Sequence, residues 1–376
     1  MRTNSPSPHR PLPGARLNIL LTSAIAGVLL SGLPTASHAD ILYVTVESPD
    51  SIQKITSNGS NTVFTTSNLS GPQGIAFDIS GNLYVANAGN HVIEKFTQGG
   101  AGSFFADTGG GTSPTGLAFD GAGNLFVSTF TADTIQKFTA GGTGSPFVTT
   151  AANTGPTGLA FDRAGNLFVS YEGPNSIEEF TAGGSGSPFA VSSLGVSPYG
   201  LAFDSQTNLY VANAARNTIY KFTPAGSGSL FAGTGLNQPT GIAFDSAGNL
   251  YAANSGDNTI EKFTTNGVPS VFASGLSGRP QFLAFTTDAG QPLPLLTLQR
   301  PFLKAKQTGS DITITISGNL SGTAYTVLTT GALGTNANWT ATATNVIAGA
   351  AGLAVFVDTN AVPNFASRFY RALVQQ

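Results

Sequence analysis

Few side chains in this 376-residue chain could carry out acid–base, nucleophilic or metal chemistry. The sequence has no cysteine and three histidines, of which only His91 lies after residue 39. A serine hydrolase triad would have to use His91, and no serine stands in the pattern of a nucleophile elbow. The lack of cysteine excludes disulfide bonds and thiolate metal sites. We therefore predict no catalytic residue, no metal site and no cofactor, and we interpret His91 as an ordinary surface loop residue.

A series of aspartates, each followed four residues later by asparagine, forms a second group of candidates. Its members are Asp78, Asp120, Asp162, Asp204 and Asp245. Calcium loops draw oxygen ligands from a dense series of carboxylates, whereas each of these stretches contains one acid. Aspartate also accepts backbone N–H groups in tight turns. The pattern favours turns between strands, with calcium binding as the alternative.

These aspartates belong to a repeat that organises most of the chain. The alanine of a recurring Gly-Ile/Leu-Ala-Phe core lies at Ala76, Ala118, Ala160, Ala202, Ala243 and Ala284, with spacings of 42, 42, 42, 41 and 41 residues. Each unit contains four strand-length runs, which in the second unit are 116–119, 124–128, 134–138 and 146–149. No segment has a helical period of useful length. We predict an all-β fold built from four-stranded blades.

The two ends of the repeat region predict the number of blades. Residues 41–44, 51–55 and 62–65 match the last three strands of a unit, five complete units follow, and 280–285 matches a lone first strand. These end pieces would together form a sixth blade and leave no free sheet edge. We expect a six-bladed β-propeller over residues 40–289, closed by its own ends.

The repeat unit resembles the NHL repeat, and the resemblance covers about residues 40 to 286. The clearest match is Gly81-Asn-Leu-Tyr-Val-Ala-Asn-Ala-Gly-Asn-His-Val-Ile-Glu-Lys-Phe96. The resemblance implies a six-bladed propeller. It implies no single function, because the family includes protein-binding and RNA-binding modules, extracellular sensor domains and some lyases.

Two enzymatic groups with a similar fold can be compared with these residues. Streptogramin lyases and peptidyl-hydroxyglycine lyases use several channel-facing histidines, or a histidine and acids around a metal, and this chain offers only His91. Gluconolactonase-like propellers place a glutamate at the start of an inner strand. The corresponding positions here contain no acid; they are Gly71, Ser113, Gly155, Ser197, Gln238 and Arg279.

Polar residues just before each innermost strand are the best candidates for a ligand site, because innermost strands line the channel of a propeller. They are Gln73, Thr115, Thr157, Tyr199, Thr240 and Gln281. The loops between the second and third strands should add Asn87, Thr129, Tyr171, Asn213 and Asn254 at the same channel mouth. Together these residues predict an uncharged, hydrogen-bonding funnel suited to a protein, peptide or glycan. Alternatively, they hold water and satisfy the loop backbone.

The N-terminal segment has the features of a secretory signal peptide. Arginines precede a short apolar run at 17–30, and Ser37 with Ala39 fits a small-x-small cleavage site. We expect residues 1–39 to be removed by a cut after Ala39 and the protein to be secreted or periplasmic. The remaining 13 basic and 19 acidic residues give a net charge of −6. This charge, the absence of a basic run and the absence of a later apolar span argue against nucleic acid binding and membrane insertion.

The C-terminal segment differs in character from the repeats. A proline-rich linker at 290–300 precedes alternating runs at 311–316, 324–328, 339–343, 352–357 and 368–372. Short strands with polar turns predict a small β-sandwich at 301–376. This segment loosely resembles fibronectin-type or immunoglobulin-like tails, mainly through Asn338-Trp-Thr and Ser367-Arg-Phe-Tyr-Arg371.

The combined expectation is a secreted or periplasmic propeller that acts as a non-catalytic binding or scaffold module for a neutral polar ligand. The alternative is a propeller-fold lyase or lactonase-type hydrolase with an atypical site. The shortage of histidine and of clustered acids favours the binding module.

Overall fold

The computed structural model describes residues 40–190, 197–287 and 292–293, together with the strand backbone of six segments between Phe302 and Val374. The predicted signal peptide with its cleavage site, and most of the predicted linker, lie outside the described residues. Within the described part, no helix has the length and apolar character needed to cross a membrane.

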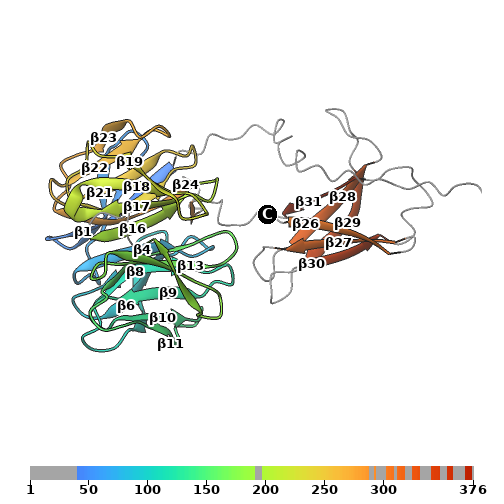
Figure 1. Cartoon of the computed structure of the whole chain (residues 1–376), viewed down its shortest axis with the longest axis horizontal. Coiled ribbons are helices and arrows are strands. Elements are labelled where there is room, and N and C mark those ends of the chain that lie inside the picture. Colours follow the sequence, from blue (N-terminus) through green and yellow to red (C-terminus); the bar gives the residue numbers. More distant parts are fainter. Residues whose placement is uncertain are drawn as a thin grey trace, which may run out of the picture. The chain divides into compact units, whose positions relative to one another are not determined.

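Five complete blades follow one another along the chain, and each is a four-stranded antiparallel sheet (Figure 1). They are β4–β7 (Pro72–Phe77, Leu83–Asn87, Val92–Phe96, Gly102–Asp107), β8–β11 (Pro114–Phe119, Leu125–Thr129, Thr134–Phe138, Gly144–Thr149), β12–β15 (Pro156–Phe161, Leu167–Tyr171, Ser176–Phe180, Gly186–Ala190), β16–β19 (Pro198–Phe203, Leu209–Asn213, Thr218–Phe222, Gly228–Ala232) and β20–β23 (Pro239–Phe244, Leu250–Asn254, Thr259–Phe263, Pro269–Ala273). The four strands predicted for each unit are confirmed.

The sixth blade joins the two ends of the propeller. Strand β24 (Arg279–Thr287) pairs with β1 (Asp40–Glu47), which continues into β2 (Ser51–Ile55) and β3 (Asn61–Thr65). The short strand β25 (Pro292–Leu293) pairs with the edge of β24 opposite β1. Innermost strands β4, β8, β12, β16, β20 and β24 contact one another in sequence around a closed ring. The predicted six-bladed propeller and its mode of closure are confirmed.

Close approach of neighbouring innermost strands requires glycine. A Cβ atom built on Gly158 would collide with the carbonyl oxygen of Tyr199 in the next blade, and Gly74, Gly116, Gly200 and Gly241 are in the same situation. The sixth blade has Phe282 at this position.

Aromatic triads join every blade to the next. An aromatic residue from the second strand contacts one phenylalanine of its own blade and one of the following blade, as Tyr84 does with Phe105 and Phe119 at 4.9 and 5.0 Å between ring centroids. The same arrangement closes the ring, where Tyr251 lies 4.8 Å from Phe285. Edge-on aromatic pairs of this kind add about 0.5–1.5 kcal/mol beyond area burial.

The recurring aspartates form the predicted turns. Asp78 accepts a hydrogen bond from the backbone N–H of Asn82 at 2.8 Å, and its second oxygen accepts one from the Asn82 side chain at 2.8 Å. Asp120, Asp162, Asp204 and Asp245 make the corresponding bonds. The turn interpretation is confirmed. Among the described residues, no three His, Asp or Glu side chains are grouped so that they could hold a metal ion.

The C-terminal strands form two three-stranded antiparallel sheets. Their order is β26-β27-β30 and β29-β28-β31, with bounds Phe302–Thr308, Asp311–Ser317, Ala354–Asp358, Thr340–Ile347, Ala324–Thr330 and Phe369–Val374. Five of these strands overlap the five predicted runs, and β26 was not predicted. The packing of these sheets as a β-sandwich, and the resemblance to immunoglobulin-like tails, stay predictions, since Trp339 and the connecting segments lie outside the described residues.

Candidate functional site

The predicted channel mouth lies where each innermost strand begins and the second strand of the same blade ends. Pro72 pairs with Asn87 there, and the pairing is interrupted by a register shift before Ile75 resumes it. The same shift occurs in all five complete blades. The repeat therefore brings equivalent residues to one end of the ring.

The residues at the ends of the second strands are buried, contrary to the expectation of an open funnel. Asn87, Thr129, Tyr171, Asn213 and Asn254 are each 2% exposed or less. Asn87 accepts a hydrogen bond from the N–H of Ser70 and donates to the carbonyl of Asn68, and so holds the connection between two blades. Asn254 does the same with the N–H of Asn237 and the carbonyl of Gly235. Both asparagines therefore have the role predicted as the alternative to ligand binding, which is to form hydrogen bonds with the backbone of the loops.

The buried Tyr171 is not a surface aromatic either. Burial, and then the neighbouring carboxylate of Glu178, raise the pKa of its hydroxyl. Asn213 is buried as well, and its side-chain nitrogen and oxygen have no hydrogen-bond partner among the described residues.

Residues that precede the innermost strands divide into two groups. Thr115, Thr157, Thr240 and Gln281 are buried. Thr157 and Thr240 donate their hydroxyls to carbonyls of the next blade, Pro198 at 3.1 Å and Gln281 at 2.8 Å. Gln73 and Tyr199 stay half-buried. Among the eleven residues predicted to line the channel mouth, Gln73 and Tyr199 retain surface that a ligand could touch.

Tyr199 meets Phe282 across the end of the ring. The two ring centroids are 5.7 Å apart, although Tyr199 belongs to β16 and Phe282 to β24, with β20 between them. The intervening strand has Gly241 at its closest approach to β24. Without a side chain at Gly241, the aromatic rings of two non-neighbouring blades can reach each other near the axis.

Charged side chains surround this aromatic pair, which corrects the prediction of an uncharged mouth. Arg279 pairs with Glu47 at 2.8 Å, and Gln281 donates to the same carboxylate at 3.2 Å. Glu172 accepts a hydrogen bond from the hydroxyl of Ser197 at 2.8 Å. We call Glu47, Glu172, Tyr199, Arg279, Gln281 and Phe282 the axial cluster.

The electrostatics of the axial cluster keep the tyrosine protonated. Burial, then the negative charges of Glu172 and Glu47, raise the pKa of the Tyr199 hydroxyl. At neutral pH this hydroxyl is therefore a hydrogen-bond donor or acceptor and not a base. The carbonyl oxygen of the Gln73 side chain, on the neighbouring β4, is buried without a hydrogen-bond partner among the described residues.

His91 forms a hydrogen bond with the backbone of the next blade. Its Nδ1 accepts a hydrogen bond from the N–H of Ser113 at 3.3 Å, at the entry to the next blade. Asp50, Asp133, Asn175 and Asn217 accept the equivalent backbone N–H groups in other blades. This supports the interpretation of His91 as a loop residue and adds a contact that the sequence analysis missed.

The sequence contained a signal for the missed members of the axial cluster. Phe282 occupies a place that is glycine in the other five units, and Arg279 is the only charged residue in its series. Glu172 and Glu47 take the same place after the second strand of their blades, where the other four units have uncharged residues. Departures from a repeat consensus identify positions that serve something other than blade packing. Glu47 and Arg279 come together only when β1 and β24 pair.

Solved structures confirm the fold by similarity. A catalytically inactive histidine-to-alanine variant of virginiamycin B lyase from Staphylococcus aureus, solved with quinupristin, is 18% identical, with a TM-score of 0.51 over 68% of this chain and 94% of that one. A chain of a nidogen/laminin complex is 20% identical, with a TM-score of 0.58 over 65% and 98%. A gluconolactonase from Xanthomonas campestris is 16% identical, with a TM-score of 0.51 over 66% and 84%. At these identities the likeness shows the propeller fold alone.

Family membership rests on the sequence itself. No curated protein sequence matches the chain. The model of the virginiamycin B lyase family matches residues 31–288, which is more than half of the chain and spans the whole propeller. The protein therefore belongs to the virginiamycin B lyase family.

Proposed function

We propose that this protein is a non-catalytic binding propeller whose axial cluster recognises a polar ligand such as a glycan or a peptide. The observation that carries the proposal is the contact of Tyr199 with Phe282, at 5.7 Å between ring centroids. Tyr199 stands where most other blades have threonine, and Phe282 stands where the other blades have glycine. An aromatic pair at a channel mouth offers a flat apolar surface for a sugar ring or a peptide side chain.

The polar members of the axial cluster favour a ligand that donates hydrogen bonds. Glu172, Glu47 and the Gln73 side-chain carbonyl are acceptors, and Arg279 already pairs with Glu47. Sugar hydroxyls and peptide N–H groups are donors of the required kind. We further propose that the leader at 1–39 directs the protein to the periplasm or the outside of the cell. In that setting the C-terminal segment would serve for spacing or attachment.

Binding of the protein to an array of glycans and peptides tests this proposal. Tyr199→Thr and Phe282→Gly install the residues that other blades tolerate, so both variants should fold. We expect each to weaken binding at least tenfold, which is about 1.4 kcal/mol and typical of a central aromatic contact. Tyr220→Thr, on β18 of the same blade as Tyr199, is the matched control and should bind as the unmodified protein does. Binding that survives both axial substitutions would place the ligand elsewhere.

A lyase or lactonase activity is the second candidate, and family membership favours it. The S. aureus relative is inactive when one histidine is replaced by alanine, whereas the Nδ1 of His91 is engaged by Ser113. Any reaction at the axial cluster would use Glu172 as the base and the protonated Tyr199 as the acid. Incubation with quinupristin and with simple lactones, with and without divalent cations, tests this candidate. Turnover that Glu172→Gln abolishes would favour the enzyme, and no turnover under any condition would exclude it for these substrates.

A further inference from the structure

A lysine, an aspartate and an aromatic ring form a recurring triad on the face opposite the axial cluster. In the β4–β7 blade, Lys95 lies 3.4 Å from the Asp78 carboxylate and 5.0 Å from the centre of the Tyr84 ring. Three other blades repeat this triad with Lys137–Asp120, Lys221–Asp204 and Lys262–Asp245 at 3.4–3.6 Å. In the β12–β15 blade Glu179 replaces the lysine, and Asn166 donates a hydrogen bond to it. A lysine of this series thus normally has a carboxylate beside it.

The sixth blade keeps the lysine and the ring but lacks the aspartate. Lys54 lies 5.9 Å from the centre of the Tyr43 ring. The residue after Phe285 is Thr286, at the place that Asp78 or Asp245 takes after Phe77 or Phe244. Within residues 40–190, 197–287 and 292–293, no carboxylate forms an ion pair with Lys54. Asp40, at the start of β1, accepts hydrogen bonds from Ser246 at 2.7 and 2.8 Å, and Glu47, at the end of β1, pairs with Arg279.

The tyrosine hydroxyl of the sixth blade lacks the same partner. Tyr84 and Tyr251 donate to the carboxylates of Asp78 and Asp245 at 3.3 and 3.1 Å. Tyr43 occupies the equivalent position opposite Ala284 in β24, with Thr286 in place of the acid. Burial raises the pKa of its hydroxyl, so this group is a donor at neutral pH. Two donors that bind a carboxylate elsewhere in the propeller therefore face a site without one.

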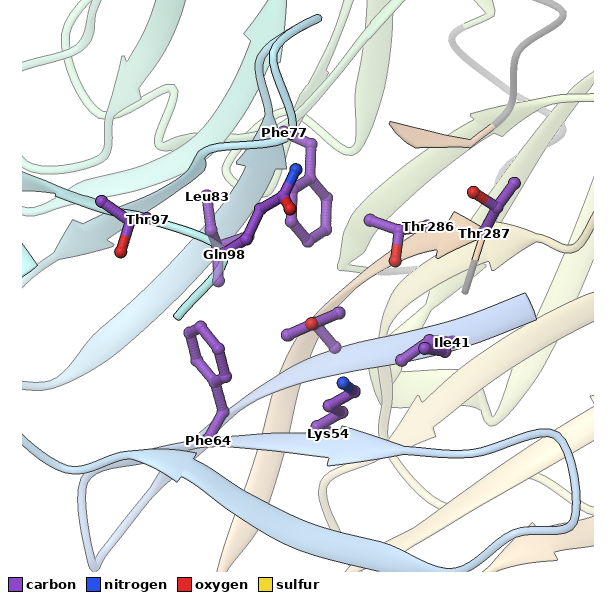
Figure 2. Close-up of a pocket in the computed structure, with 11 residues that line it drawn as sticks. Ile41, Lys54, Phe64, Phe77, Leu83, Thr97, Gln98, Thr286 and Thr287 are labelled. Carbon is purple, nitrogen blue, oxygen red and sulfur yellow. The ribbon is translucent and has the colours of Figure 1, made fainter. Parts of the chain in front are cut away.

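A cavity of about 240 Å³ opens at this site, between the sixth blade and the β4–β7 blade. Figure 2 shows Lys54, Gln98 and Thr286 around the cavity, with Phe64 and Phe77 as its apolar walls. An equivalent cavity of about 310 Å³ lies between the β8–β11 and β12–β15 blades, but there Lys137 is neutralised by Asp120. The two cavities have equivalent aromatic walls. They differ in whether a carboxylate of the chain already pairs with the lysine.

We propose that the Lys54 cavity binds a small carboxylate with an aromatic or aliphatic body. The carboxylate takes the place of the missing aspartate beside Lys54 and Tyr43, and the body packs between Phe64 and Phe77. Charge-assisted hydrogen bonds from a partly buried lysine give such a site its preference for an anion. The cavity volume limits the ligand to a small molecule. This site is separate from the axial cluster and does not depend on the function proposed there.

Titration of the whole protein with benzoate, followed by calorimetry or by NMR, tests the proposal. We expect saturable binding that Lys54→Met weakens at least tenfold. Thr286→Asp should weaken it equally, because it restores the internal carboxylate that pairs with lysine in four other blades. Lys137→Met is the matched control in the second cavity and should leave benzoate binding unchanged. Neutral benzamide should bind at least tenfold more weakly than benzoate.

Several outcomes would overturn this inference. They are the absence of saturable benzoate binding, binding that Thr286→Asp leaves intact, and equal binding of benzamide. Asp288 follows Thr286 by two residues in the sequence. Benzoate binding that appears only in the Asp288→Asn variant would also overturn the inference, since the chain itself would then supply the carboxylate. Thermal unfolding of each variant shows whether the propeller remains folded. Thr286→Asp keeps the proposal testable even if Lys54→Met fails to fold, because the repeat accommodates aspartate at this place in the five complete blades.

Discussion

In several blades, one loop side chain accepts hydrogen bonds from backbone N–H groups of the next blade. His91, Asp133, Asn175 and Asn217 all adopt positive φ values, between 51° and 65°. Histidine, asparagine and aspartate are enriched in this left-handed region. The common geometry explains why three residue types share one role, and it shows that the only histidine after residue 39 is used for blade packing.

Asp133 makes the most extensive of these contacts and should give stability a pH dependence. Burial alone would raise the pKa of its carboxyl, but hydrogen bonds from the N–H groups of Gly155, Asn153 and Thr154 outweigh burial and lower the pKa. A lowered pKa in the folded state contributes stability above the unfolded value near 3.9 and loses it as pH falls through the folded value.

Asp133→Asn should therefore cost about 1 kcal/mol of unfolding free energy at pH 7, the scale of one net hydrogen bond in a partly exposed position. The cost should shrink below about pH 4, where the unmodified carboxyl becomes protonated. Urea unfolding at both pH values measures this difference. A penalty that is equal at pH 7 and pH 3 would show that the charge of Asp133 is not what stabilises the contact.

At the scale of the element, the innermost strand is limited by how closely it approaches the next one. Gly158 lies against the carbonyl of Tyr199, and Ser170 donates a hydrogen bond to that same carbonyl at 2.6 Å. The Ser170 hydroxyl also accepts from the N–H of Gly158 at 2.8 Å. The strands are thus held together by hydrogen bonds at a distance that excludes a side chain. This contact also positions Tyr199 of the axial cluster.

Gly158→Ala should destabilise the propeller by about 1–3 kcal/mol, because the added methyl group requires the β12 and β16 strands to separate. Gly121→Ala is the control, since a Cβ atom at Gly121 meets no atom within 4 Å. We expect the control to change stability by less than about 0.5 kcal/mol. Chemical denaturation of the two variants makes the comparison, and equal stabilities would contradict the packing argument.

At the scale of the whole molecule, stability depends on closure of the ring by β24. Leu283 and Phe285 of this strand are 7% and 2% exposed, and both belong to the core that β24 shares with β1 and the β20–β23 blade. Burial of each such side chain contributes about 1.5–3 kcal/mol. Pairing of β24 with β1 also covers a backbone edge that would otherwise be free to join another chain.

A chain shortened to end after Ser277 should lose at least about 3 kcal/mol, equivalent to about 6 °C or more in Tm. It should also self-associate through the exposed edge of β1. A chain shortened to end after Leu293 keeps β24 and β25 and is the matched control. Calorimetry and size-exclusion chromatography compare the two. Similar Tm values and monomeric behaviour for both would show that closure contributes little.

Much of this fold could be predicted from the sequence, because the signals that specify it are local. The regular spacing of Ala76 and its equivalents defines the blade, and Asp78 and its equivalents define the turns. The strand-like runs at 41–44 and 280–285 indicate closure, since only their pairing removes the free edges. These patterns depend on residues within one unit, or on one unmatched strand at each end.

The candidate sites, in contrast, were decided by tertiary structure. Tyr199 and Phe282 come from blades that are not neighbours, and they meet because Gly241 leaves the space between them empty. Asn87 and Tyr171 have residue types typical of a ligand site, yet packing buries them. Lys54 differs from Lys95 only because the strand that pairs beside it has Thr286 at the place of aspartate. The spacing of the repeat identifies which positions recur. Which of the exceptional residues face one another depends on ring closure, because contacts between distant blades exist only after the first and last strands have paired.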